Sequence, residues 1–179
     1  MRIYVVRHGV TELNKKHLFN GWIDESLADE GREQAEKLKG ELPTDARTIY
    51  TSKLKRAKET AEIINQKLNL PIVADARLNE VNVGTLAGKS FEQMEAENGP
   101  AYSKEKYQHL EYDYRPLGGE SVDEVRARVH SIISEIKADH NNGPILLVVH
   151  GGILRMLEYD YNQKFIGDMP NGHVTQIEI

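Results

Sequence analysis

Cysteine is absent from this 179-residue chain, which excludes disulfide bonds, thiolate metal sites and a cysteine nucleophile. No apolar run approaches the roughly 20 residues that a membrane-spanning helix needs. The chain also lacks an excess of positive charge, because its 23 Lys and Arg residues are outnumbered by 28 Asp and Glu residues. A general nucleic-acid binder needs such an excess. We therefore expect a cytoplasmic protein without nucleic-acid or membrane partners.

Strand and helix patterns alternate along the chain, which is typical of an α/β fold. Short β-branched or apolar runs predict strands at residues 1–6, 47–51, 71–74 and 145–149, and a shorter edge strand at 173–179. Apolar residues at helical spacing predict helices from Asp29, as N-cap, to Leu42, from Leu54 to Leu68, and after a capping box at Ser121 and Glu124. We expect a single domain over residues 1–179, a three-layer α/β/α sandwich with a mostly parallel sheet.

Residues from about 91 to 119 form the least regular stretch of the sequence. Four tyrosines lie there among many charged residues. We expect helical insertions over the carboxyl edge of the sheet that act as a short lid. The tyrosines favour a role in covering the core, although aromatic rings are also suited to stacking on a substrate.

Two histidines end apolar runs at opposite ends of the sequence. His8 follows the first predicted strand and is preceded by Arg7, and His150 follows the strand at 145–149. Arg56 comes early in the helix after another strand, and Glu80 lies in the loop after the third. Because the carboxyl ends of parallel strands meet at one edge of a sheet, these five side chains can form a single site.

These residue types suit phosphoryl transfer. A guanidinium presents a planar fork that matches phosphate oxygens and stays charged at any working pH. A neutral imidazole can attack phosphorus and so divide one difficult displacement into two easier ones. Glu80 can protonate the departing alkoxide, and Glu12, Glu92 and Glu95 are alternative donors because geometry decides which acid acts.

The motifs around these residues resemble the histidine phosphatase superfamily, in its phosphoglycerate-mutase-like branch. The resemblance covers nearly the whole chain, with five elements in the same order. They are Arg7-His8-Gly9 with Asn14, Asn20-Gly21-Trp22-Ile23-Asp24, the segment Ser52 to Ala61 around Arg56, Leu78-Asn79-Glu80 with Gly84 and Gly88, and His150-Gly151-Gly152. One such tripeptide is a weak signal, whereas five elements in order are a strong one.

The resemblance implies a role for each matching residue. His8 would be phosphorylated on Nε2 while a backbone carbonyl holds its Nδ1–H, and Glu80 would donate a proton. The groups that hold phosphoryl oxygens would be Arg7, Arg56, Asn14 and His150, and further substrate-binding residues would be Asn20, Gly21 and Gly151. The family needs neither a metal nor another cofactor. The expected partner is a small phosphorylated substrate, and a homodimer is compatible with the sequence.

The chain departs from the mutases of this family at several places. After the acid, mutases carry Arg-His-Tyr, whereas this chain has Val81-Asn82-Val83. Phe91 replaces a mutase lysine, Gly152 replaces an asparagine, and most of a longer insertion with paired arginines is missing. Because those mutase groups retain the bisphosphorylated intermediate, water should intercept the phosphohistidine here.

We therefore predict a metal-independent phosphomonoesterase. One alternative is a phosphoglycerate mutase-type phosphotransferase, in which Lys104, Lys106 or Arg115 would replace the missing groups. The other is a weakly active relative that binds phosphorylated ligands. The substrate stays open among sugar phosphates, phosphoglycerates, nucleotide-derived esters and phosphoamino acids.

Overall fold

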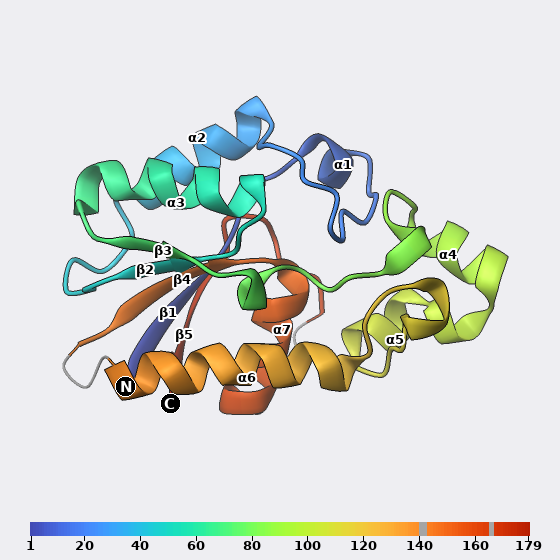
Figure 1. The fold of residues 1–179 in the computed structure, drawn as a ribbon. Coiled ribbons are helices and arrows are strands. Elements are labelled where there is room, and N and C mark those ends of the chain that lie inside the picture. The colour runs from blue at the N-terminus through green and yellow to red at the C-terminus, as the bar shows by residue number, and fades with distance from the viewer. Residues whose placement is uncertain (140–142, 165–166) are drawn as a thin grey trace.

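A five-stranded sheet forms the centre of the computed structural model, which describes residues 1–139, 143–164 and 167–179. Its strand order is β3-β2-β4-β1-β5 (Figure 1). The strands are β1 (Arg2–Arg7), β2 (Ile49–Thr51), β3 (Ile72–Ala74), β4 (Ile145–Val149) and β5 (Val174–Glu178). Neighbouring strands run parallel except for β5, which pairs antiparallel with β1 at the edge. The predicted mostly parallel sheet with a C-terminal edge strand is confirmed.

Helices cover both faces of this sheet. Figure 1 shows α2 (Asp29–Leu38) and α3 (Lys55–Leu68) on one face, and α6 (Val122–Asp139) and α7 (Gly151–Asn162) on the other. The shorter helices are α1 (Glu12–Lys15), η1 (Ala76–Leu78), η2 (Gly84–Leu86), α4 (Phe91–Asn98), η3 (Pro100–Tyr102), α5 (Lys104–Gln108) and η4 (Arg115–Leu117). The predicted three-layer α/β/α sandwich is confirmed.

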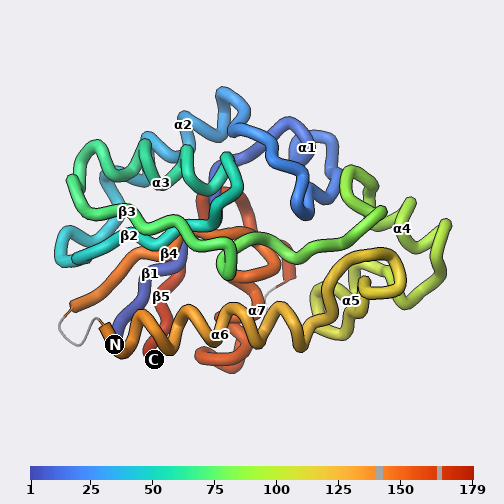
Figure 2. Tube along the Cα trace, viewed as in Figure 1, coloured from blue at the N-terminus to red at the C-terminus, as the bar shows by residue number. Residues whose placement is uncertain are grey.

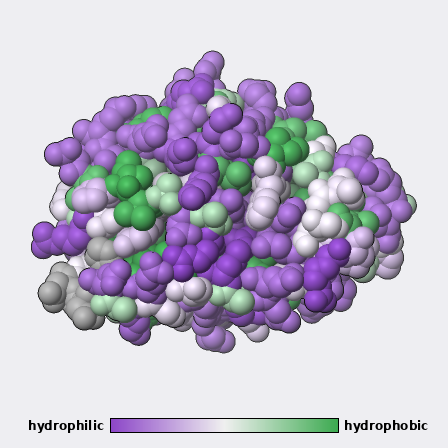
Figure 3. Space-filling view, viewed as in Figure 1, coloured by the Kyte–Doolittle hydropathy of each residue, from purple (hydrophilic) through white to green (hydrophobic). Residues whose placement is uncertain are grey.

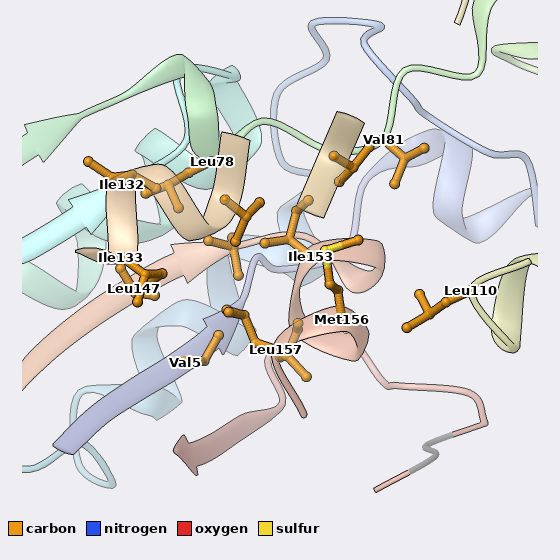
Figure 4. Close-up of a cluster of buried hydrophobic side chains, with 14 of the residues drawn as sticks. Val5, Leu78, Val81, Leu110, Ile132, Ile133, Leu147, Ile153, Met156 and Leu157 are labelled. Atoms are coloured by element: carbon orange, nitrogen blue, oxygen red, sulfur yellow. The ribbon is translucent and has the colours of Figure 1, made fainter. Parts of the chain in front are cut away.

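The core lies on both sides of the sheet because the central strands are apolar throughout. In β4, Leu147 packs in the cluster under α6 and α7, whereas Leu146 and Val148 pack in the cluster under α2 and α3. Successive side chains of a strand point to opposite faces, so a continuous apolar run needs cover on both. Figure 4 shows part of the larger cluster, with side chains from the sheet and from both covering helices.

The start of α2 differs from its prediction. Its N-cap is Ala28 in an extended conformation, and no side chain caps the helix there. Asp29 instead lies in the first turn, where its carboxylate accepts a hydrogen bond from Arg32 at 2.8 Å. An acidic residue in the first turn still stabilises the helix dipole. The helix ends at Leu38, so buried Leu42 lies beyond it.

The predicted capping box of α6 is confirmed. The Ser121 hydroxyl accepts from the Glu124 N–H at 3.3 Å, and the Glu124 carboxylate accepts from the Ser121 N–H at 2.8 Å. The stretch at 91–119 contains the expected helical pieces, α4, η3, α5 and η4. The tube in Figure 2 shows α4 and α5 together at one end of the molecule, on the side of α1. Movement of this segment as a lid stays a prediction.

Hydrophilic side chains predominate on the face shown in Figure 3, and hydrophobic ones form separate small patches. None of the helices in the described ranges combines the length and the apolar character that crossing a membrane requires.

Candidate active site

The two histidines meet because their strands are neighbours. Arg7 of β1 lies opposite Val149 of β4, so His8 and His150 leave the sheet side by side. Their ring centroids are 5.0 Å apart, and the His8 N–H donates to the Val149 carbonyl at 3.0 Å. A cavity of about 450 Å³ opens at this edge, and its wall includes Arg7, His8, Arg56 and Glu80. Four of the five side chains that the sequence places at this edge therefore line one cavity, and His150 does not occur among the described lining residues.

One tautomer of His8 fits its surroundings. Its Nδ1 lies 2.7 Å from the Gly9 carbonyl oxygen. Because a carbonyl oxygen only accepts hydrogen bonds, Nδ1 carries the proton and Nε2 keeps its lone pair. Burial, with the charges of Arg56 and Arg7, holds the pKa of His8 well below its usual 6.5. The imidazole is therefore neutral at pH 7 and has a nucleophilic nitrogen.

The loop after His8 is held against α2 by a direct backbone contact. A Cβ on Gly9 would stand 2.9 Å from the Cα of Gly31 and closer to its carbonyl oxygen. In the other direction, a Cβ on Gly31 would stand 2.9 Å from the Val10 nitrogen. The Gly9 N–H donates to the Thr60 hydroxyl at 3.2 Å. Two helices thus fix the loop that carries His8.

Two guanidinium groups face the cavity. Arg56 is fully buried, and its Nη1 and Nη2 each donate at 2.8 Å, to the carbonyl oxygens of Ile23 and Gly21. Arg7 donates through Nη1 to the Met169 carbonyl oxygen. Among the described residues, neither Nε–H has a hydrogen-bond acceptor. Burial lowers the pKa of Arg56 to about 10, so the group stays charged at neutral pH. Paired buried cations with free donors are suited to an anion.

His150 lies behind His8 and is fully buried. It is the N-cap residue of α7, and its side chain does not cap the helix. Neither ring nitrogen has a partner among the described residues. Burial and the charge of Arg56 hold its pKa well below the usual value, so the ring is neutral and offers one donor and one acceptor.

Glu80 is held at both its backbone and its side chain. Its Oε1 accepts from the Val81 N–H at 2.9 Å, and its Oε2 accepts from the Gly152 N–H at 3.2 Å. Its carbonyl oxygen accepts from Trp22 Nε1 at 2.7 Å and from Arg128 Nη2 at 3.0 Å. The carboxyl group therefore has a fixed position on the cavity wall.

The predicted substrate-binding residues occupy different places. Asn14, Asn20 and Gly151 line the cavity, whereas among the described lining residues Gly21 does not occur. Gly21 instead contributes the carbonyl oxygen that holds Arg56. The Asn14 amide donates to the Asn20 side-chain oxygen at 2.7 Å, so the two amides are held together.

Several lining residues were not predicted as site residues, among them Arg155, Asn171 and Tyr107. Arg155 lies four residues after Gly151 on α7, a spacing that places both on one helix face and was a usable signal. Asn171 donates to the His8 carbonyl oxygen at 3.1 Å, and no sequence pattern marks it. Tyr107 comes from α5. Of the alternative acids, Glu92 lines the cavity and Glu12 pairs with Lys15.

Gly152 leaves room for three neighbouring side chains. A Cβ at this position would stand 2.5 Å from Glu80 Oε1, closer to the Tyr107 hydroxyl oxygen, and 2.9 Å from Val81 Cγ2. At Gly151 the nearest atoms would be 3.4 Å away on Arg7, which is an ordinary contact. The asparagine that mutases carry after the first glycine would therefore displace the side chains of Glu80 and Tyr107 here.

Comparison with known proteins shows the family of the chain. The profile of the histidine phosphatase superfamily (branch 1) matches residues 3–179. A putative phosphoserine phosphatase 2 from Hydrogenobacter thermophilus is 34% identical over 87% of this chain and 76% of its own length. A 2,3-bisphosphoglycerate-dependent phosphoglycerate mutase from Azorhizobium caulinodans is 34% identical over 87% of this chain and 78% of its own.

Solved structures give the same assignment. A mycobacterial glucosyl-3-phosphoglycerate phosphatase in complex with VO3 superposes with a TM-score of 0.82 at 28% identity, over 98% of this chain and 90% of that one. The profile match covers His8, Arg56 and Glu80, which line one cavity, and His150, whose ring lies 5.0 Å from that of His8. The chain belongs to the histidine phosphatase superfamily, branch 1.

Proposed function

We propose that this protein hydrolyses a small phosphomonoester, without a metal ion, through a phosphohistidine at His8. The observation that carries the proposal is the orientation of the neutral His8 ring, with Nδ1 held by Gly9 and Nε2 left as a nucleophile beside two arginines. Family members include both phosphatases and mutases, so phosphoryl transfer is common to the relatives.

The first step transfers the phosphoryl group to the enzyme. Nε2 of His8 attacks phosphorus while the P–O ester bond breaks and its electron pair moves to the leaving oxygen. Arg7, Arg56 and the neutral His150 hydrogen-bond the phosphoryl oxygens and stabilise the charge that spreads over them. Glu80 gives its proton to the leaving oxygen.

In the second step, water attacks phosphorus and the P–N bond breaks. Glu80, now a carboxylate, takes the proton from that water. Inorganic phosphate leaves, and His8 and Glu80 return to their starting states. The fixed position of the Glu80 carboxyl supports both of its roles, because acid and base act at the same side of the phosphorus.

Three features support hydrolysis over mutase activity. Val81 and Val83 are fully buried in the core, so they present no charge to a second phosphate. Phe91 packs its ring 5.3 Å from that of Tyr107. Lys104 lines the cavity but forms an ion pair with Asp168 at 2.9 Å. A mutase must keep its bisphosphate intermediate bound through contacts remote from the reacting group.

The mutase alternative has one observation in its favour, since Arg155 and Lys104 both line the cavity. Of the other candidate charges, Lys106 pairs with Glu111 at 2.5 Å and Arg115 pairs with Asp113 at 2.6 Å. Incubation with 3-phosphoglycerate and a 2,3-bisphosphoglycerate primer separates the two functions. We expect slow phosphate release or no reaction, and interconversion that outpaces phosphate release would overturn the proposal.

Turnover should be measured with a panel of phosphate esters in EDTA. The names of the relatives make O-phosphoserine and glucosyl-3-phosphoglycerate useful members of that panel. Rapid quench with labelled substrate should trap an acid-labile, base-stable phosphoenzyme. The His8→Ala variant should form none, and full activity in that variant would exclude His8 as nucleophile.

The role of Glu80 gives a leaving-group test. Glu80→Gln should slow alkyl phosphates far more than aryl phosphates, because a phenolate leaves without much protonation. Glu92→Gln is the matched control, since Glu92 also lines the cavity. Equal slowing of both substrate classes by Glu80→Gln, or selective slowing by Glu92→Gln, would assign the proton to another group.

A further inference from the structure

Tyr107 is one of the side chains that the segment at 91–119 contributes to the cavity wall. Tyr107 of α5 is only 5% exposed, yet it lines the cavity. Its ring lies 5.0 Å from that of Phe19 and 5.6 Å from that of Tyr112. On another side the guanidinium carbon of Arg155 lies 5.0 Å from the ring centroid. These contacts hold the ring in one position.

The hydroxyl group of Tyr107 lies beside the candidate acid. The position that a Cβ would take on Gly152 is 2.5 Å from Glu80 Oε1 and closer still to the Tyr107 oxygen. The two oxygens therefore border the same small space at the start of α7. Glycine at 152 leaves that space open, and any side chain would fill it. Burial and the charge of Glu80 also raise the pKa of Tyr107 well above 10, so its O–H keeps its proton.

Two neighbouring tyrosines provide an internal comparison. Tyr112 and Tyr114 continue the same ring stack, with 5.3 Å between their centroids. Their hydroxyl groups are buried and have no partner among the described residues. Neither residue lines the cavity in the described part of the chain. Tyr112 thus adds a ring to the stack away from the cavity, whereas Tyr107 adds a hydroxyl at the site.

We infer that the Tyr107 hydroxyl is a second donor to the leaving ester oxygen, acting beside Glu80. This inference rests on the proposed function. As the P–O bond breaks, negative charge develops on the ester oxygen, which accepts the proton of Glu80 and a hydrogen bond from Tyr107. Tyr107 keeps its own proton throughout, so the step adds no further proton transfer. Such a donor acts most strongly where charge develops in the transition state.

The test compares Tyr107→Phe with Tyr112→Phe, two variants that each remove one buried hydroxyl from the same stack. For Tyr107→Phe we expect kcat/KM to fall about tenfold for alkyl phosphates and less than about twofold for an aryl phosphate such as p-nitrophenyl phosphate. For Tyr112→Phe we expect less than about twofold with either substrate. Melting temperatures of both variants check the fold.

A second measurement does not depend on one pair of substrates. Over a series of aryl phosphates, kcat/KM of Tyr107→Phe should depend more steeply on the pKa of the leaving phenol than kcat/KM of the parent does. Unchanged slopes and equal losses for alkyl and aryl substrates would overturn the inference. If the parent traps phosphate on His8 but Tyr107→Phe behaves as the parent, only this inference fails. If the parent forms no phosphoenzyme, the proposed function fails with it.

Discussion

The guanidinium of Arg56 forms two hydrogen bonds to the backbone and has one further N–H donor available. Both terminal nitrogens donate to backbone carbonyl groups, and Nε–H is left for a phosphoryl oxygen. A lysine ammonium is a single point charge and cannot keep these three directions at once. We expect Arg56→Lys to lower kcat/KM at least about tenfold, equivalent to about 1.4 kcal/mol of transition-state stabilisation.

The control for this prediction is Arg32→Lys on the neighbouring helix. Arg32 pairs with Glu59 at 2.7 Å and its side chain is 42% exposed. Surface ion pairs of this kind contribute little, so activity should be unchanged. Normal turnover by a folded Arg56→Lys variant would mean that Arg56 does not hold the substrate.

At the scale of single residues, the sequence predicted those site members that follow strands. The positions of His8, Arg56 and Glu80 could be inferred because parallel strands end at one edge of a sheet. Tyr107 and Asn171 could not be inferred, because they come from segments whose placement depends on long-range packing. Their approach to His8 and Glu80 has no local signature.

Helix α6 braces the loop that carries Glu80. The Arg128 guanidinium donates to the carbonyl oxygens of Arg77 and Asn79 at 2.7 Å and to that of Glu80 at 3.0 Å. The Glu120 carboxylate binds the same guanidinium at 2.8 Å and also accepts from the Asn82 N–H at 2.9 Å. One side chain of a long helix thus binds three backbone carbonyl groups of the acid loop.

We expect Arg128→Lys to affect both folding and chemistry. Loss of several hydrogen bonds should lower the free energy of unfolding by about 1–3 kcal/mol. A displaced Glu80 should lower kcat for alkyl phosphates more than for aryl phosphates, with little change in KM. Arg126→Lys on the same helix is the control, because Arg126 pairs with Asp160 instead. Equal kcat losses for both substrate classes would show that Arg128 does not act through the proton of Glu80, and an unchanged kcat would leave Arg128 a role in folding alone.

At the scale of elements, periodicity predicted the five strands and the helices α2, α3 and α6, whereas α7 was not among the predicted helices and the bounds of α2 differ. Helix α2 has Ala28 as its N-cap, and Asp29 lies in its first turn and pairs with Arg32. The short helices at 91–119 were predicted as helical, but the way α5 folds back to the cavity was not. The spacing of apolar residues predicts which face of a helix is buried, and it does not predict which other element packs against that face.

For the whole molecule, two buried neutral histidines predict how stability depends on pH. Burial lowers the pKa of both His8 and His150 from 6.5. Below pH 6.5 these two histidines are therefore protonated in the unfolded chain and stay neutral in the folded chain. The free energy of unfolding should therefore fall as pH drops below 6.5, by up to about 1.4 kcal/mol per pH unit for each histidine. Above pH 6.5 these groups should have no effect.

Urea unfolding at several pH values between 5 and 8 measures this dependence. The free energy of unfolding of the parent is compared with that of a His8→Asn/His150→Asn double variant. The carboxylates titrate in both proteins, so the difference in slope isolates the histidines. Identical slopes would mean that the two rings are protonated within the fold.

The backbone contact between Gly9 and Gly31 limits how this chain can vary. Each glycine is opposed by main-chain atoms of the other segment, so no compensating change of a neighbouring side chain can make room for a larger residue. In a saturation library sorted only for protease resistance, both positions should be depleted of every substitution, whereas changes at His8 should persist and vanish only under selection for turnover. Depletion at both positions would then show that folding requires these two glycines, although Gly9 stands next to His8 in the sequence. Conservation of Gly9 would therefore not by itself indicate a catalytic role.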